Sequence, residues 1–299
     1  MNLLITGAWQ EAKKYIETIE KMGHQVQFLQ FEKDELPCDY EWVEGVIGNG
    51  LFLSHPIEKF VNLRYIQLTS AGFDRVPMNY VKEHNIQIQN ARGVYSIPMA
   101  EFAVSGVLQI YKQASFFREN QKNHRWEKHR ELLELYGKTV AIVGCGSVGT
   151  ECAKRFAACG CEVIGVDLYP REDENYSNMV KLSELNQLLP IIDILVLTLP
   201  LTNQTRHLMN QDRFERMKNG TVLVNISRGA VVDTGALIGA INRLGGAVLD
   251  VFEEEPLDEN SPLWDLENVV LTPHNSFIGD GNQKRLERII LFNINEVHI

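Results

Sequence analysis

The sequence predicts an α/β protein that contains two doubly wound parallel sheets. In the second half of the chain, a strand rich in β-branched residues runs into the glycine-rich turn 144–149, which opens a helix. In the first hundred residues, short apolar segments alternate with segments of helical periodicity. Such alternation is typical of parallel sheets covered by helices on both faces. A chain of 299 residues, 44% of them hydrophobic, is long enough for about two such domains.

The first part of the chain carries five apolar segments short enough to be strands. We expect strands at residues 3–5, 26–29, 45–47, 65–68 and 86–88, and helices at 11–22, 57–61 and 77–84. A single long helix is then expected from Ser96 to about Phe117. It is predicted by apolar residues at helical spacing, namely Met99, Ala103, Val107 and Ile110.

The second half continues the alternation after the glycine turn. We expect strands at residues 194–198, 222–225, 247–251 and 269–271, and helices at 182–189, 212–217 and 234–243. The last segment, 283–297, has helical periodicity and is expected to return to the first domain. We therefore predict a substrate (catalytic) domain of residues 1–97 and 279–299, a dinucleotide-binding domain of residues 98–278, and a ligand cleft between them.

The glycine turn has the GxGxxG pattern of a dinucleotide site. Gly144 allows a tight turn, Gly146 lets the backbone approach a pyrophosphate, and Gly149 lets helix and strand pack closely. The N-terminus of the helix presents unpaired N–H groups to phosphates. The next strand is expected at residues 162–166 and is followed by Asp167, which can accept hydrogen bonds from a ribose diol. Without the strands and the acid, the same glycines would be compatible with an ordinary βα turn.

The charge on Asp167 favours NAD as the cofactor, because a carboxylate repels the 2′-phosphate of NADP. Arg171, four residues further on, weakens that preference. NAD is therefore the predicted cofactor, and NADP is the alternative.

Polar residues follow three of the later predicted strands, in the segments 225–229, 249–257 and 271–274. The carboxyl ends of parallel strands line one crevice, so an arginine, an acid and a histidine are expected to meet there. Arg228 suits a carboxylate and a carbonyl, because its guanidinium offers paired N–H donors. His274 suits proton transfer to the carbonyl oxygen. The acid that orients His274 is one of residues 253–255, and spacing alone does not choose among them.

Composition excludes several other classes of protein. A net charge of −10 argues against a nucleic-acid surface and against an anionic membrane. The longest apolar run, 188–201, is broken by prolines and an aspartate, and the N-terminus lacks the features of a signal peptide. The chain has five cysteines, and no histidine at ligand spacing accompanies Cys159 and Cys161, so we expect no metal site and a cytoplasmic location. A basic cluster between residues 112 and 130 is interpreted as a solvated helix or a subunit contact.

The ordered segments GCGSVG, Asp167, LPLTNQT, NISRG, LDVFEEEPL and LTPH resemble the D-isomer-specific 2-hydroxyacid dehydrogenase family, most strongly over residues 138–275. The resemblance implies a Rossmann-type cofactor domain and a flavodoxin-like substrate domain. It also implies that Arg228 binds substrate, that Glu255 rather than its neighbours pairs with the histidine, and that His274 is the acid/base. The predicted cofactor-binding residues are Gly144, Gly146, Ser147, Val148, Gly149, Asp167, Leu199, Pro200, Thr205, Ile226, Ser227 and Asp250.

The resemblance extends to the turn formed by Ser70, Ala71 and Gly72, which matches the family's substrate loop. A turn of small residues can present successive N–H donors to an anion. Ser70, Ala71 and Gly72 are therefore expected to bind the substrate together with Arg228 and His274. Leu51 and Phe52 are expected either to contact the substrate side chain or to pack in the core.

Three features depart from the family pattern. The family usually has a small apolar residue and then Ala or Ser after the histidine, where this chain has Asn275 and Ser276. The segment 277–280 replaces the usual glycine–threonine run, and the crossover 236–247 is about two residues short. The leading hypothesis is an NAD-dependent enzyme that interconverts small 2-keto acids and D-2-hydroxy acids, and is a homodimer. The alternatives are an NADP-linked glyoxylate or hydroxypyruvate reductase, and a non-enzymatic NAD sensor that resembles the corepressors built on this fold.

Overall fold

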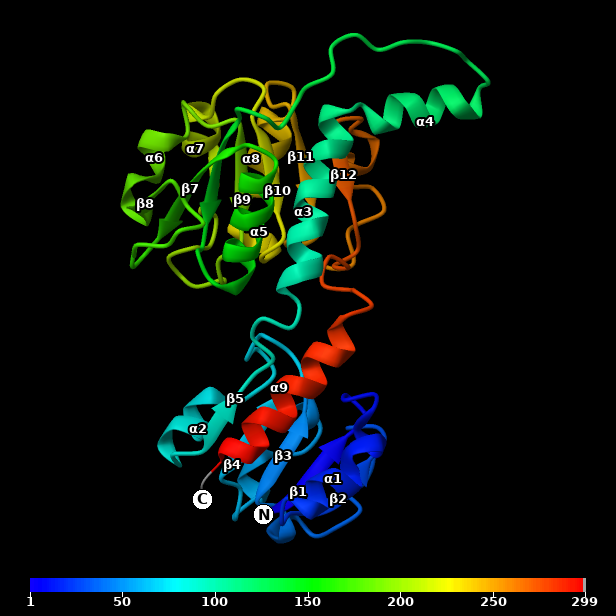
Figure 1. The fold of residues 1–299 in the computed structure, drawn as a ribbon, viewed down its shortest axis with the longest axis vertical. Coiled ribbons are helices and arrows are strands. Elements are labelled where there is room, and N and C mark those ends of the chain that lie inside the picture. Colours follow the sequence, from blue (N-terminus) through cyan, green and yellow to red (C-terminus); the bar gives the residue numbers. More distant parts are fainter. Residues whose placement is uncertain (298–299) are drawn as a thin grey trace. The chain divides into compact units, whose positions relative to one another are not determined.

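A computed structural model describes residues 1–297 of the chain (Figure 1). The chain divides into two compact units, which are Met1–Tyr95 with Gly279–Ile299 (unit 1) and Ser96–Ile278 (unit 2). Each unit contains one parallel sheet, of five and seven strands respectively. The predicted α/β class with two doubly wound sheets is confirmed. The substrate-binding and dinucleotide-binding roles of the two units remain predictions.

The sheet of unit 1 has the strand order β2-β1-β3-β4-β5, which is the flavodoxin-like order. Its strands are β1 (Asn2–Thr6), β2 (Gln25–Leu29), β3 (Gly45–Gly48), β4 (Tyr65–Leu68) and β5 (Gln87–Gln89). All four pairings are parallel. Each strand falls within two residues of its predicted position.

Side chains that alternate along β1 enter two separate cores. Leu3 and Ile5 pack with Ile290 of α9 (Asn282–Glu296) and with α1 (Ile16–Lys21), whereas Leu4 packs on the opposite face, which carries α2 (Met78–Glu83). The connections also contain 3-10 turns at Ala12–Tyr15, Tyr40–Trp42, Leu51–Leu53 and Ile57–Lys59. The predicted helix 57–61 is therefore only a 3-10 turn, and the predicted helix 11–22 begins as one.

Glu32 joins the carboxyl ends of neighbouring strands in unit 1. Its carboxylate accepts hydrogen bonds from Thr6 Oγ1 at 2.8 Å, from Asn49 N at 2.6 Å and from Gly50 N at 2.7 Å. These contacts fix the turn after β3. In that turn Leu51 is 1% exposed and Phe52 packs edge-on against an aromatic ring, so both are packing residues in this structure.

The sheet of unit 2 has the order β12-β11-β10-β9-β6-β7-β8, with every pairing parallel. The chain starts at β6 and winds outward in both directions, so the order reverses between β6 and β9. That switch point is where open α/β sheets bind ligands. The strands are β6 (Thr139–Val143), β7 (Glu162–Asp167), β8 (Asn178–Lys181), β9 (Ile194–Leu197), β10 (Val222–Asn225), β11 (Gly246–Leu249) and β12 (Val269–Leu271).

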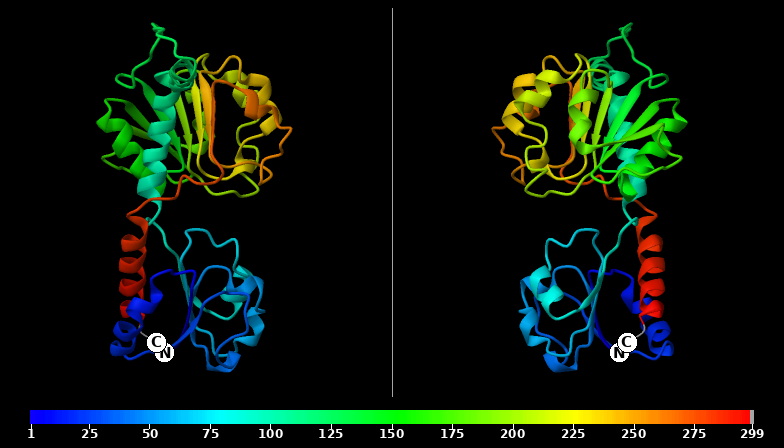
Figure 2. Two further views of the ribbon diagram at one scale, coloured as in Figure 1. Left: turned by 90° about the vertical axis from the view of Figure 1, so that its right-hand side faces the viewer. Right: turned by 90° about the vertical axis from the view of Figure 1, so that its left-hand side faces the viewer.

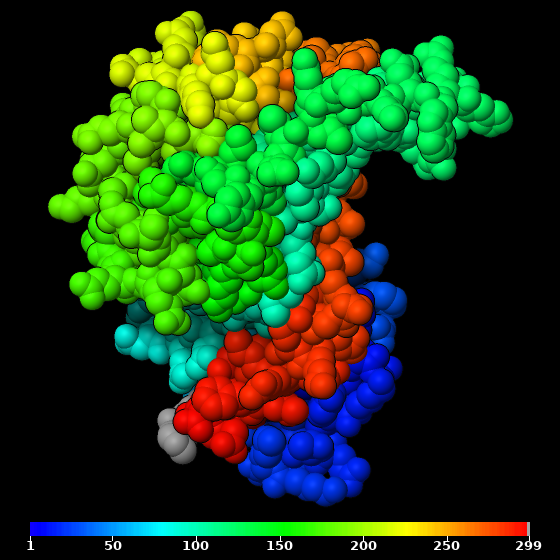
Figure 3. Space-filling view, turned by 45° about the horizontal axis from the view of Figure 1, so that its top comes forward, coloured from blue at the N-terminus to red at the C-terminus, as the bar shows by residue number. Residues whose placement is uncertain are grey.

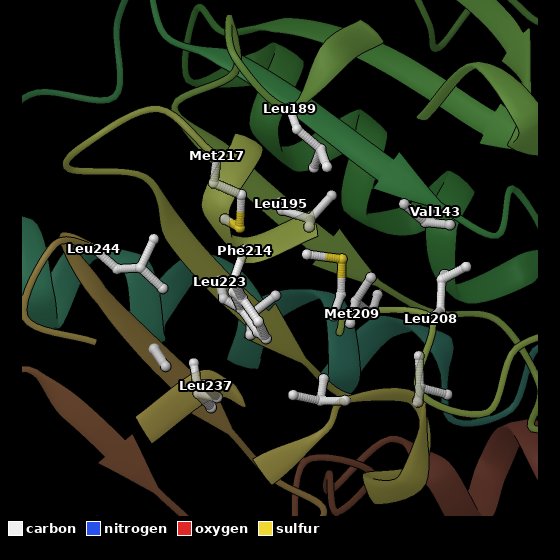
Figure 4. Packing of buried hydrophobic residues seen from close by; sticks show 14 of the residues in the cluster. Val143, Leu189, Leu195, Leu208, Met209, Phe214, Met217, Leu223, Leu237 and Leu244 are labelled. Atoms are coloured by element: carbon white, nitrogen blue, oxygen red, sulfur yellow. The ribbon is translucent and has the colours of Figure 1, made fainter. Parts of the chain in front are cut away.

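Helices cover both faces of this sheet (Figure 2). One face packs against α3 (Ser96–Tyr111) and α5 (Ser147–Ala158). The other packs against α6 (Leu185–Leu188), α7 (Gln211–Arg216) and α8 (Thr234–Ala240). Figure 4 shows this second core, in which Leu195 and Leu223 from adjacent strands lie beside Phe214 and Met217. Further 3-10 turns lie at Leu182–Glu184, Gly229–Val231 and Pro262–Asp265.

The predicted single helix from Ser96 to Phe117 is wrong, because the structure divides it. α3 ends at Tyr111, and Gln113 adopts a left-handed conformation with φ of 53° before α4 (Ala114–Lys122) begins. α4 and the segment after it then extend away from the sheet and helices of unit 2 (Figures 1 and 3). Within residues 1–297, no helix combines the length and the apolar character needed to cross a membrane.

The short crossover 236–247 is accommodated by a tight turn. α8 has seven residues, and the chain enters β11 through Gly245 and Gly246. Gly246 has φ of 151°, and an added Cβ there would lie 2.3 Å from a backbone oxygen. Glycine is required at this position because both the backbone angle and the space exclude a side chain.

Candidate active site

The glycine turn lies between β6 and α5, at the centre of the sheet of unit 2. Gly144 has φ of 97°, and a Cβ there would lie 2.7 Å from the backbone nitrogen of Leu199. A Cβ on Gly149 would lie 2.2 Å from the Gly144 oxygen, so the helix begins in direct contact with the turn. A Cβ on Gly146, by contrast, would meet nothing within 4 Å. The turn is thus closed toward the protein and open at Gly146, which fits a phosphate at the N-terminus of α5.

Asp167 closes the turn from the end of β7. One carboxylate oxygen accepts the Cys145 N–H at 2.8 Å, and the other accepts the Tyr169 N–H at 3.1 Å. A carboxylate oxygen has two lone pairs, so acceptor positions remain for a ribose diol. Arg171 reaches the same turn and donates to the Cys145 carbonyl at 3.0 Å. An acid and a cation therefore both flank the predicted ribose position.

The residues after β9 that are predicted to contact the cofactor form a turn held by hydrogen bonds among its own residues. Thr205 is 5% exposed, and its hydroxyl donates to the Pro200 carbonyl at 2.8 Å and accepts the Thr202 N–H at 2.7 Å. Leu199 is 6% exposed beside Gly144, and Pro200 is exposed. Thr205 therefore shapes the turn that presents Leu199 and Pro200 next to the glycines.

Ile226 and Ser227 follow β10 and are buried. The Ser227 hydroxyl donates to Asn225 Oδ1 at 2.8 Å, and the Asn225 amide donates to the Arg228 carbonyl at 3.1 Å. Asn225 thereby holds the backbone that leads to Arg228. The cofactor contacts expected of Ser147, Val148, Ile226 and Ser227 stay predictions.

Asp250, at the end of β11, organises the turn that carries His274. It is 1% exposed, and its carboxylate accepts hydrogen bonds from Thr272 Oγ1 at 2.6 Å, Asn275 N at 2.7 Å and Ser276 N at 3.0 Å. The Ser276 hydroxyl also donates to it at 2.5 Å. Asn275 and Ser276, the two residues that follow His274, thus supply donors to this buried carboxylate. Its cofactor contact stays a prediction.

His274 and Glu255 form a hydrogen-bonded pair. Nδ1 of His274 lies 2.8 Å from Oε2 of Glu255, whose Oε1 accepts the Phe252 N–H at 3.0 Å. The His274 backbone is left-handed with φ of 52°, and its N–H donates to the Asp250 carbonyl at 2.8 Å. The histidine side chain is 42% exposed, and Phe277 lies edge-on to its ring. The ring is therefore held on one side and accessible on another.

Arg228 stands on the neighbouring strand end, and a close backbone contact links it to the histidine pair. Its guanidinium donates to the Ser227 carbonyl at 2.8 Å. A Cβ on Gly229 would lie 1.8 Å from the carbonyl carbon of Phe252, so the chain after Arg228 touches the chain that leads to Glu255. β10, β11 and β12 are adjacent in the sheet, so the segments that carry the three predicted catalytic groups all leave the sheet at its carboxyl end.

Thr272 and Asn225 have roles that were not predicted from the sequence. Both are polar residues at strand ends, beside Asp250 and Arg228 respectively. Their position was a usable signal, because buried polar groups at such places require partners.

The turn 70–72 of unit 1 is held through its carbonyl groups. The carbonyl of Thr69 accepts from the Tyr95 hydroxyl, that of Ser70 from Ala91 N at 2.9 Å, and that of Ala71 from the Asn90 amide at 2.6 Å. Among residues 1–297, the N–H groups of Ala71 and Gly72 have no hydrogen-bond acceptor. The turn therefore offers two donors in succession, as an anion-binding turn requires.

Cys145, in the glycine turn, and Cys152, in α5, are buried packing residues. Burial raises the pKa of the Cys145 thiol to about 11 and that of Cys152 to about 12. Such thiols stay protonated and unreactive near neutral pH. All five cysteines are free thiols, and within residues 1–297 no group of three metal-ligating side chains is placed to hold a metal ion.

A doubly wound sheet with a glycine turn at its switch point and an acid at the end of the next strand defines a dinucleotide-binding protein. Comparison with known families agrees: residues 104–276 match the model of the D-isomer specific 2-hydroxyacid dehydrogenase, NAD binding domain. The chain belongs to the D-isomer specific 2-hydroxyacid dehydrogenase family.

Relatives and solved structures are consistent with this family. The chain is 35% identical over 221 residues to a glyoxylate reductase of Thermofilum pendens, covering 71% of this chain and 65% of that protein. It is 32% identical to a glyoxylate reductase of Korarchaeum cryptofilum, covering 89% of this chain and 85% of that protein. A crystal structure of a family protein from Aeromonas salmonicida subsp. salmonicida superposes with a TM-score of 0.82 at 28% identity, covering 98% and 94% of the two chains. The chain thus spans slightly under two thirds of the first of these relatives.

Proposed function

We propose that this protein is an NAD-dependent dehydrogenase that interconverts small 2-keto acids and D-2-hydroxy acids. The observation that carries the proposal is the pair formed by His274 and Glu255, in which Nδ1 and Oε2 lie 2.8 Å apart. The two residues follow β12 and β11, and Arg228 follows the next strand of the sheet, β10. An oriented imidazole together with a guanidinium suits a reaction in which a carbonyl gains a proton while a carboxylate is held.

Each side chain has a separate task in this reaction. Because Nδ1 of His274 faces Glu255, Nε2 is the nitrogen that donates a proton to the substrate oxygen in reduction and removes it in oxidation. Glu255 holds the ring in this tautomer and orientation. Arg228 binds the substrate carboxylate and polarises its carbonyl. We propose the N–H groups of Ala71 and Gly72 as further carboxylate ligands.

The residues around the glycine turn fit NAD. The open space at Gly146 and the N-terminus of α5 would receive the pyrophosphate, and Asp167 would receive the adenine ribose. When bound, the nicotinamide cofactor supplies or accepts the hydride. The residues Leu199, Pro200, Thr205, Ile226, Ser227 and Asp250 are proposed to line the same site.

The test is the oxidation of NADH in the presence of glyoxylate, pyruvate, hydroxypyruvate and longer 2-keto acids. We expect turnover with at least one of them and loss of most turnover in Arg228→Ala, with NADH binding retained. His274→Gln should lack proton transfer and should change the pH–rate profile. Wild-type protein that binds NADH but reduces none of these acids would instead support the non-enzymatic sensor.

An NADP-linked reductase is the second candidate, and the position of Arg171 favours it. Its guanidinium lies against the glycine turn on the side of Asp167, where a 2′-phosphate would be placed. Running the same assay with NADPH decides the question, because the carboxylate of Asp167 should make NADPH the poorer cofactor. Equal kcat/KM values with both cofactors would contradict the NAD preference.

We further propose that the protein is a cytoplasmic homodimer and that the segment from α4 to Tyr136 forms the subunit contact. Trp126 is 97% exposed in the free chain, and Leu133 and Tyr136 are also exposed. Asn120 is buried, and its Nδ2 has no partner within residues 1–297. A second chain would cover these apolar side chains. Light scattering should give twice the chain mass, and Trp126→Ala should weaken the association.

The cytoplasmic location is supported by the free thiols, which suit a reducing compartment.

A further inference from the structure

Of the three consecutive glutamates after Phe252, only Glu255 belongs to the proposed acid/base pair. Glu253 is bonded in a different direction: its Oε1 lies 2.6 Å from Nε2 of His207, and its Oε2 accepts the backbone N–H of Thr234 at 2.9 Å. The side chains of His207 and Glu253 are 42% and 29% exposed, so the pair lies at the surface of unit 2. Glu254 is exposed as well. The two neighbouring glutamates therefore differ in the contacts that Glu253 makes.

The partners of Glu253 come from two other elements of unit 2. His207 lies on the turn after β9, where its backbone is left-handed with φ of 49° and its N–H donates to the Ala230 carbonyl at 2.8 Å. Thr234 is the first residue of α8. Burial raises the pKa of Glu253, but the hydrogen bonds from Thr234 and His207 outweigh burial and hold that pKa below its usual value. Glu253 therefore joins both elements as a carboxylate.

The segment that Glu253 anchors carries the groups of the reaction. Phe252 donates its N–H to Glu255, and Glu255 bonds the ring of His274. The backbone of Phe252 and Glu253 is also the surface against which Gly229 packs. A movement of this segment would displace the Glu255 carboxylate and the backbone beside Arg228 together.

We propose that Glu253 is a positioning residue, which fixes the segment 252–255 by bonding His207 and Thr234. The fixed segment allows Glu255 to orient His274 and keeps the backbone beside Arg228 in place. This inference rests on the proposed function. Glu253 and His207 exchange no proton with the substrate, and their effect passes through the geometry of Glu255. Partners of this kind commonly affect activity by about 10- to 100-fold.

The test compares Glu253→Ala with Glu254→Ala, which removes the adjacent exposed carboxylate in the same way and serves as the matched control. We expect kcat to fall about 10- to 100-fold in Glu253→Ala, with the Kd for NADH within about twofold of wild type, and no such loss in the control. Glu253→Gln keeps an oxygen for Thr234 and an amide for His207, so it should recover most of the lost kcat. Hydrogen–deuterium exchange of the peptide 250–257 should be faster in Glu253→Ala only.

Three results would overturn the proposal. They are an unchanged kcat in Glu253→Ala despite a lower Tm, a Glu253→Gln variant as slow as Glu253→Ala, or unchanged exchange in the peptide 250–257. A wild-type protein that reduces no keto acid contradicts the proposed function instead. The exchange measurement, which needs no turnover, then still decides whether Glu253 orders the segment.

Discussion

Replacing Asp250 with asparagine should weaken unit 2 and slow turnover, although the two side chains have nearly the same shape. Four donor groups point at this carboxylate: the Thr272 hydroxyl, the N–H groups of Asn275 and Ser276, and the Ser276 hydroxyl. Asparagine keeps one oxygen and places an amide NH2 at the other position. The substitution therefore tests whether a negative charge holds the turn that carries His274.

The expected loss in the free energy of unfolding is the sum of the changes in these hydrogen bonds. Hydrogen bonds to a charged acceptor are roughly twice as strong as bonds to a neutral one. The bonds from the Thr272 hydroxyl and the Asn275 N–H, which keep their oxygen acceptor, should therefore each become weaker by about 0.5–1 kcal/mol. The Ser276 hydroxyl can reverse its direction and accept from the new amide. The Ser276 N–H, now 3.0 Å from each carboxylate oxygen, would keep only the contact with the remaining oxygen, which already accepts two other donors. A poorly paired buried N–H costs about 1–2 kcal/mol. We expect the free energy of unfolding of unit 2 to fall by about 2–4 kcal/mol.

Calorimetry and steady-state kinetics measure the two consequences. For a domain of this size, the loss corresponds to a decrease in Tm of roughly 5–15 °C. We expect kcat to fall at least about tenfold, because the turn 272–276 sets the position of the His274 ring. Asp258→Asn, at an exposed acid that caps a local turn, serves as the control and should change stability by about 0.5 kcal/mol. An Asp250→Asn protein with the Tm and kcat of wild type would refute the reasoning.

Three further substitutions test other contacts. Gly229→Ala would place a Cβ 1.8 Å from the Phe252 carbonyl carbon, so we expect loss of turnover with NADH binding retained; full activity would show that the backbone moves freely. Burial raises the pKa of Asp193, but hydrogen bonds from Lys218 and a backbone N–H outweigh burial and hold it below its usual value. The stabilisation is therefore present above the unfolded pKa of about 3.9 and is lost as the pH falls through the lower folded pKa. In urea unfolding, the advantage of wild type over Asp193→Asn should thus shrink below about pH 4, and a constant difference would contradict the linkage. Glu32→Gln should destabilise unit 1 by about 1–3 kcal/mol, because one oxygen cannot serve its three donors, and an unchanged Tm would argue otherwise.

The strands that position the site were predictable because their signals are local. The apolar runs that form β6 and β10 are buried on both faces of the sheet. The first is followed by Gly144, and the second ends at Asn225. β8 was missed, because an edge strand with two exposed ends, Asn178 and Lys181, carries no apolar run. The break at Gln113 was also missed, because neither glycine nor proline marks it.

The choice among residues 253–255 required three-dimensional structure. All three have the same side chain, so composition and spacing could not separate them, and only the family resemblance favoured Glu255. In the structure, Glu255 faces His274 while Glu253 faces His207, a residue 46 positions earlier in the chain. Pairings of this kind depend on how β9 and β11 lie in the sheet, which local sequence does not encode. The same holds for Asp250, whose partners follow it by more than twenty residues.

The helix α9 has a consequence for how the protein is made. It supplies Leu286, Ile290 and Ile294 to a core that begins with Leu3 and Ile5. During synthesis on the ribosome, the part of this core that α9 covers therefore stays exposed until α9 has been translated, after the whole of unit 2. Unit 2, whose residues are contiguous, can fold during that interval. We expect truncations that remove α9 to leave an aggregation-prone unit 1 that requires chaperones, while unit 2 still folds.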